Sequence, residues 1–135
     1  MLKDLLEAMP VTGRRIRVFK GEECQWIFPV EQLHKGDVVR VLPGERIPSD
    51  GVIVDGCSRV TSQPIVRAAV IKELQIGDAV LCGTVNCSAV IDVRLTSDIG
   101  ASSLVQKIKR LQQDCDLGLW ERVLGIFRRA HRLGA

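Results

Sequence analysis

Five carboxylates beside turns are the residues of this sequence that could carry hydrolytic chemistry. They are spread over the middle of the chain, at Glu45, Asp50, Asp55, Asp78 and Asp92. A hydrolase needs a nucleophile, a base that activates it and a group that orients the base. No spacing in the sequence marks out such a set, and carboxylates beside glycine ordinarily cap the turn or are solvated. A hydrolase with a site of its own therefore stays open as one hypothesis.

The thiols are the other candidates for chemistry, as metal ligands or redox groups. They are an odd number without a CxxC pair: Cys24, Cys57, Cys82, Cys87 and Cys115. This pattern argues against a disulfide framework and is typical of reduced cytosolic thiols. Cys82 and Cys87 lie in strand-like sequence on opposite faces, with no histidine nearby, so we expect no metal site and interpret both as buried structural thiols. The isolated His34 and His131 are predicted to be solvated or structural.

The sequence does not predict a nucleotide cofactor. A P-loop requires several glycines followed by Lys and Ser or Thr, because its backbone N–H groups cradle phosphates. The nearest candidates, at residues 42–45 and 82–84, each hold a single glycine. We interpret both as turns and expect no cofactor.

The composition is that of one folded domain of 135 residues. Hydrophobic residues make up 46% and charged residues 26%, which excludes a disordered chain. Aromatic residues make up only 4% and the net charge is only +3, so no nucleic-acid partner is expected. No window approaches the roughly 18–20 apolar residues of a membrane span, and the first residues lack the long apolar run of a signal peptide. We therefore expect a soluble, cytoplasmic chain.

A β body is predicted between about residues 14 and 96. In this region short runs of β-branched residues alternate with turns that contain glycine, proline or asparagine. The body begins with a hairpin around Lys20-Gly21-Glu22 and ends with strands over 80–84 and 87–95. Gly-Asp pairs at 36–37 and 77–78 each precede a strand, which we interpret as a recurring turn type.

Helical periodicity is confined to the two ends of the chain. Apolar residues predict one helix over about 2–9, ended by Pro10, and a second over about 101–114. We therefore assign residues 1–115 to one domain and residues 116–135 to a C-terminal basic amphipathic helix. Two interpretations of that last helix stay open: packing on the domain or on a partner chain, and a position near a membrane surface.

The stretch Gly36 to Gly56, GDVVRVLPGERIPSDGVIVDG, is the most distinctive motif. It closely resembles the start of the actuator domain of P-type cation-transporting ATPases, particularly the heavy-metal, P1B-like branch. Residues 77–86, GDAVLCGTVN, and the helix after them continue the resemblance in the same order, over about residues 1–115. The resemblance implies a distorted, jelly-roll-like β structure flanked by N- and C-terminal helices. It also implies a cytoplasmic place in a membrane protein, beside the phosphorylation and nucleotide-binding domain.

The catalytic loop of that family is where this sequence departs from the pattern. The family carries Thr-Gly-Glu, whose Glu helps to deprotonate the water that hydrolyses an aspartyl phosphate, a general-base role worth ~10² to 10⁴ in rate. An ungapped comparison places Val66, Arg67 and Ala68 at these positions. A methyl group at residue 68 cannot accept a proton. We expect the loop from Gln63 to Val70 to be exposed and to lack catalytic residues.

Three hypotheses follow for the function. The chain is an actuator domain of a heavy-metal pump with a degenerate Thr-Gly-Glu loop, or a stand-alone regulatory module that reuses the fold, or the hydrolase considered above. The Asp-Lys-Thr-Gly-Thr phosphorylation motif of a complete pump is missing from this sequence. The chain alone is therefore not expected to be an enzyme.

Overall fold

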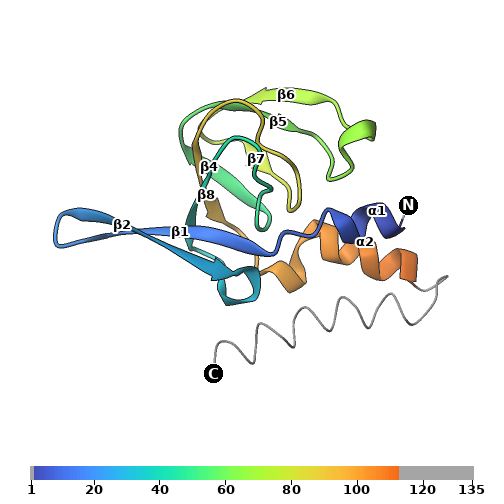
Figure 1. Cartoon of the computed structure of the whole chain (residues 1–135), viewed down its shortest axis with the longest axis horizontal. Coiled ribbons are helices and arrows are strands. Elements are labelled where there is room, and N and C mark those ends of the chain that lie inside the picture. The colour runs from blue at the N-terminus through green and yellow to red at the C-terminus, as the bar shows by residue number, and fades with distance from the viewer. Residues whose placement is uncertain (1, 113–135) are drawn as a thin grey trace.

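The computed structural model describes residues 2–112, which form a six-stranded antiparallel sheet, a separate two-stranded ribbon and two short helices (Figure 1). The order in the large sheet is β2-β1-β3-β8-β4-β7, and β5 pairs with β6 in the ribbon. The strands are β1 Thr12–Phe19, β2 Glu22–Pro29, β3 Val38–Val41, β4 Gly51–Asp55, β5 Ser58–Thr61, β6 Ile71–Leu74, β7 Ala79–Val80 and β8 Ile91–Leu95. The predicted mainly β fold with helices at its ends is confirmed.

The two helices lie side by side at one end of the molecule (Figure 1). Helix α1 spans Leu2–Glu7 and ends before the predicted residue 9. Helix α2 begins at Ser103, later than the predicted residue 101, and is described as far as Gln112. Residues Ile99–Ala101 form a separate 3-10 turn, η3, before α2 begins. The apolar faces of α1 and α2 share a buried cluster: Leu5, Met9, Val30, Cys82, Ile99, Leu104, Val105 and Ile108. The predicted C-terminal helix lies outside the described residues.

The predicted N-terminal hairpin is confirmed. Strands β1 and β2 pair over their full length, from Thr12 opposite Pro29 to Phe19 opposite Glu22. Lys20 and Gly21 make the turn with φ of 53° and 79°, as a two-residue hairpin turn of the I′ kind requires. Only Arg14 and Arg15 of β1 pair with β3, so the remainder of the hairpin projects beyond the body (Figure 1).

The two Gly-Asp pairs form the same turn twice, as predicted. Gly36 and Gly77 both have φ of 95°. The Asp37 carboxylate accepts a hydrogen bond from the backbone N–H of His34 at 2.9 Å, and Asp78 accepts one from Gln75 at 2.9 Å. Each carboxylate therefore closes its own turn, which is the ordinary role of Asp at such positions.

The strands predicted over 80–84 and 87–95 are too long. Strand β7 ends at Val80, because Gly83 adopts φ of 81° and the chain turns there. Asn86 is fully buried, and its side-chain amide donates to the carbonyl oxygens of Val41 (2.9 Å) and Ala89 (2.6 Å). The hydrogen bonds of this asparagine stabilise the long turn that leads into β8. The first residues of the strand predicted over 87–95 therefore belong to that turn.

The connection between β3 and β4 fastens the sheet to the helices. Ile47, in the middle of this connection, is fully buried in the core between the strands. Asp50, its last residue, accepts hydrogen bonds from the backbone N–H of Cys82 (2.8 Å), the backbone N–H of Ser103 (2.7 Å) and the Ser103 hydroxyl (2.7 Å). Asp50 thus stabilises the first turn of α2 from a distant part of the chain.

The substitution Asp50→Ala tests this role. It leaves the N–H groups of Cys82 and Ser103 without their acceptor, and we expect it to lower the free energy of unfolding by about 2–4 kcal/mol in urea denaturation. Asp55→Ala is the matched control, because Asp55 is exposed at the end of β4, and it should change stability by less than about 0.5 kcal/mol. An equal loss of unfolding free energy in the two variants would contradict the stabilising role of Asp50.

Candidate functional site

The loop from Ser62 to Val70 connects β5 to β6 and carries the positions singled out in the sequence. Its ends are joined by two hydrogen bonds, from Ser62 N–H to the Val70 carbonyl (2.9 Å) and from Val70 N–H to the Ser62 hydroxyl (3.0 Å). The neck of the loop is therefore closed, and the residues between form a protrusion from the ribbon.

The tip of this loop is a single 3-10 turn, η2, over Val66–Ala68. Val66 is 51% exposed and the Arg67 side chain 76% exposed. The predicted exposure of residues 63–70 is correct at Gln63, Val66, Arg67 and Val70 but wrong at Pro64, which is buried. Ile65 packs against the helical cluster, so an apolar root fixes the loop while its tip faces solvent.

An ion pair holds the tip against the N-terminal helix. Arg67 Nη2 donates to Asp4 Oδ2 of α1 at 2.7 Å. Glu7 and Arg46 line the same shallow cleft beside the loop. Since the Arg67 side chain is largely exposed, solvent screens this pair and its contribution to stability is small. Its consequence is geometric, because it directs the one charged side chain of the tip toward α1.

Arg46 anchors the root of the loop, and sequence reasoning did not single it out. Its Nη1 donates to the carbonyl oxygens of Pro64 (3.0 Å) and Gly83 (2.6 Å). This guanidinium therefore connects the β3–β4 connection to the loop and to the turn after β7. The only signal in the sequence was its place inside the distinctive motif.

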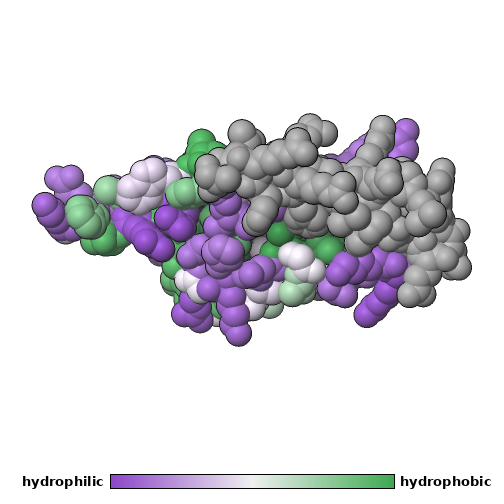
Figure 2. All heavy atoms as spheres, turned by 90° about the horizontal axis from the view of Figure 1, so that it is seen from below, coloured by the Kyte–Doolittle hydropathy of each residue, from purple (hydrophilic) through white to green (hydrophobic). Residues whose placement is uncertain are grey.

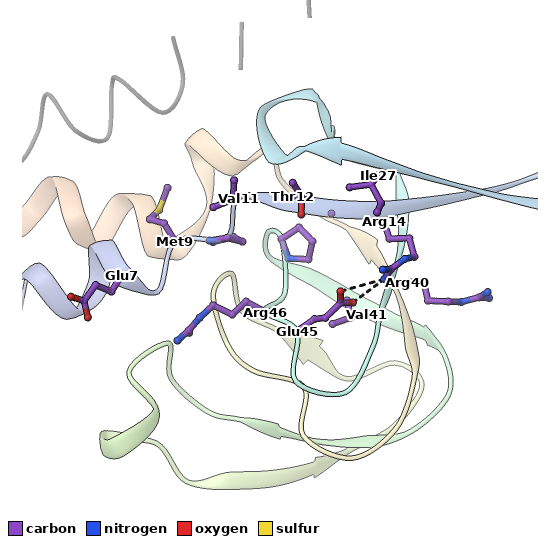
Figure 3. A pocket seen from close by; sticks show the side chains of 13 residues that line it. Glu7, Met9, Val11, Thr12, Arg14, Ile27, Arg40, Val41, Glu45 and Arg46 are labelled. Atoms are coloured by element: carbon purple, nitrogen blue, oxygen red, sulfur yellow. Dashed lines mark hydrogen bonds and ion pairs between the residues drawn. The ribbon is translucent and has the colours of Figure 1, made fainter. Parts of the chain in front are cut away.

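A pocket of about 320 Å³ lies on the other side of Arg46, where the α1–β1 link meets the β3–β4 connection (Figure 3). Arg14 Nη1 donates to both carboxylate oxygens of Glu45, at 3.0 and 3.3 Å, and Figure 3 shows Arg46 extending away from this pair. Glu45 also accepts from the backbone N–H of Leu42 at 2.8 Å. The carboxylate is thus committed to structural contacts, which does not favour a role as a general base.

The remaining carboxylates of the hydrolase hypothesis do not lie together in one site either. Asp50 binds the start of α2 and Asp78 closes its turn, as described above. Asp92 accepts two hydrogen bonds from Arg40, at 2.9 and 3.1 Å, and Asp55 is its cross-strand neighbour. Within residues 2–112 no three Asp, Glu, His or Cys side chains lie together as a metal site would require. The geometry therefore gives this hypothesis no site.

The cysteines differ from one another in exposure. Cys82 is fully buried, and burial raises the pKa of its thiol to about 12. Cys87 and Cys57 are exposed. The prediction of a buried thiol is therefore correct for Cys82 and wrong for Cys87, because the chain turns between them instead of continuing as one strand.

Thiol labelling with iodoacetamide at pH 8 checks this difference. We expect Cys57 and Cys87 to be modified in the folded protein, since reaction requires an accessible thiolate. Cys82 should react only after unfolding, because its thiol is buried and its pKa is far above the pH of the experiment. Peptide mass mapping separates the sites. Modification of Cys82 at the rate of Cys87 in the folded protein would contradict this packing.

The comparisons with known proteins point to one family. The family model of the P-type ATPase actuator domain matches residues 10–113. A probable copper-exporting P-type ATPase V of Mycobacterium tuberculosis is 40% identical over 91 residues, 67% of this chain and 11% of that protein. A zinc-transporting ATPase of Synechocystis sp. is 33% identical over 105 residues, 78% of this chain and 14% of that protein. This chain therefore spans only a small part of the relatives that it matches.

A solved structure has the same fold. The crystal structure of a zinc-transporting PIB-type ATPase in the E2.Pi state superposes with a TM-score of 0.69 at 24% identity, over 84% of this chain and 18% of that one. No helix within residues 2–112 is long and apolar enough to cross a membrane.

Proposed function

Because this chain belongs to the P-type ATPase actuator domain family, we propose that it serves as the cytoplasmic actuator domain of a heavy-metal P-type ATPase-like protein. The copper and zinc transporters among its relatives support the heavy-metal branch. In this role the domain would face the phosphorylation and nucleotide-binding domain of the same protein. The loop from Ser62 to Val70 would be the part that reaches that domain.

The same proposal holds that the domain does not catalyse dephosphorylation. The observation that carries it is the tip of the loop, where Val66 and Arg67 are the exposed side chains and neither can act as a general base near neutral pH. The segment 62–70 contains no carboxylate or histidine at all. Asp4, a carboxylate that bonds the tip, is paired with Arg67.

The alternative is a stand-alone regulatory module, and Arg67 favours it. A guanidinium at the tip can donate charge-assisted hydrogen bonds to a carboxylate or an acyl phosphate, but it cannot activate water. Such a tip would dock on an acidic or phosphorylated partner and leave it intact. In both candidate functions, therefore, the tip of the loop binds its partner but does not hydrolyse it.

A chimaeric pump tests the proposal. Residues 10–113 would replace the actuator domain of a copper-exporting P-type ATPase, and decay of the phosphoenzyme formed from ATP would be followed. We expect decay ~10² to 10⁴ times slower than in the parent pump, because the general base is missing. The triple substitution Val66→Thr, Arg67→Gly and Ala68→Glu should recover most of that rate.

Ile76→Glu is the matched control, since it adds a carboxylate at an exposed site on another turn and should not accelerate decay. Decay at the parental rate in the unsubstituted chimaera would overturn the assignment of these loop positions. A folded chimaera that forms no phosphoenzyme, with or without the restored loop, would instead favour the stand-alone module.

A further inference from the structure

The outer edge of strand β2 has no neighbouring strand among residues 2–112, and its half next to Pro29 is apolar. Strand β2 is the first strand of the large sheet, and only β1 pairs with it among the described residues. Trp26 is 45% exposed and Ile27 65% exposed. In Figure 2 the hairpin is the narrow projection at the left, where hydrophobic and hydrophilic residues interleave on the visible face. Since the hairpin extends beyond the body, a second strand could approach this edge (Figure 1).

Strand β2 carries few of the features that protect an edge strand from pairing. Proteins block such edges with charged side chains, especially lysine, or with proline, a bulge or a covering segment. The charges of β2, Glu22 and Glu23, are confined to its end at the hairpin turn. The register with β1 is continuous, so there is no bulge, and the only proline is Pro29 at the very end. The five residues before it, Cys24 to Phe28, carry no charge. An exposed edge with this composition is a template for strand addition.

The sequence of β2 matches a second copy of itself. A two-fold axis perpendicular to the sheet pairs two β2 strands antiparallel and keeps the same sheet face on the same side. With the axis at Gln25, residues 22–28 of each copy pair. This is the longest such register that avoids both the hairpin turn and Pro29, which has no N–H to donate.

The charges of the strand agree with this register. Glu22 and Glu23 lie at the turn end of β2, so antiparallel pairing places them opposite Phe28 and Ile27 of the second copy. Neither carboxylate therefore faces another carboxylate, which would destabilise the pair. Cys24 would lie opposite Trp26, and Gln25 would face its own equivalent across the axis. Each exposed apolar residue of the strand thus gains a cross-strand neighbour.

We propose that two copies of this chain associate through antiparallel pairing of their β2 strands and so join two six-stranded sheets into one. An interface of one short strand from each copy is small, which makes the dimer weak and dependent on concentration. This inference is independent of the loop from Ser62 to Val70 and of the function proposed for it.

Sedimentation velocity of the full 135-residue chain in reductant, from micromolar to millimolar concentration, tests the proposal. We expect a concentration-dependent dimer. Gln25→Glu places two carboxylates opposite each other on the axis, and it should raise the dissociation constant roughly fivefold or more. Gln75→Glu is the matched control, because it makes the same change at an exposed residue in the turn before β7, and it should leave the dissociation constant unchanged.

Hydrogen exchange identifies the interface itself. The amides of residues 24–28 should become more protected as the wild-type concentration rises, and they should not do so in Gln25→Glu. Circular dichroism confirms that both variants are folded. A wild-type protein that stays monomeric up to millimolar concentration overturns the proposal. Equal weakening in the two variants, or a dimer without added protection at residues 24–28, also overturns it.

Discussion

The carboxylate and carbonyl of Asp50 are the point on which the rest of the fold depends. The carboxylate accepts from the N–H of Cys82 and from both donors of Ser103, while the carbonyl accepts from the N–H and hydroxyl of Thr96. One residue therefore fixes the turn after β7, the end of β8 and the start of α2. The next residue must be glycine, because a Cβ on Gly51 would lie 2.6 Å from the Arg94 carbonyl oxygen. Asp50 and Gly51 together therefore hold the sheet against the start of α2.

The loop from Ser62 to Val70 is attached to this frame without supporting it. Its root is held by Arg46, by the buried Pro64 and by the closed neck at Ser62, and its tip makes one exposed ion pair to Asp4. Substitutions at the exposed Val66 and Arg67 therefore leave the core packing untouched. This separation supports the proposal that a chain can keep the actuator fold with Val66, Arg67 and Ala68 at the family's catalytic positions.

The sequence predicted elements whose signals are local and missed those set by distant contacts. The hairpin at Lys20-Gly21 and the turns at Gly36 and Gly77 follow from residues that tolerate positive φ, so they were found. The length of β7 was not predicted correctly. It depends on Gly83 and on the buried Asn86, whose side-chain amide donates a hydrogen bond to the carbonyl of Val41, far away in the sequence. The buried Pro64 and the anchoring role of Arg46 were missed for the same reason. The loop positions themselves came only from resemblance to a family, since Val66-Arg67-Ala68 carries no signal of its own.

The thermal stability of the loop-restored protein tests most directly the claim that the frame and the loop are separate. Val66→Thr, Arg67→Gly and Ala68→Glu together alter only the tip, and this account predicts a cost of about 0.5 kcal/mol or less for each, as for a substitution that does not disturb the core. Differential scanning calorimetry should therefore give a melting temperature within a few degrees of the unsubstituted chain, since ~1 kcal/mol shifts the melting temperature of a domain of this size by roughly 4 °C. A melting temperature lower by about 15 °C or more would show that the tip supports the core, and it would contradict this account.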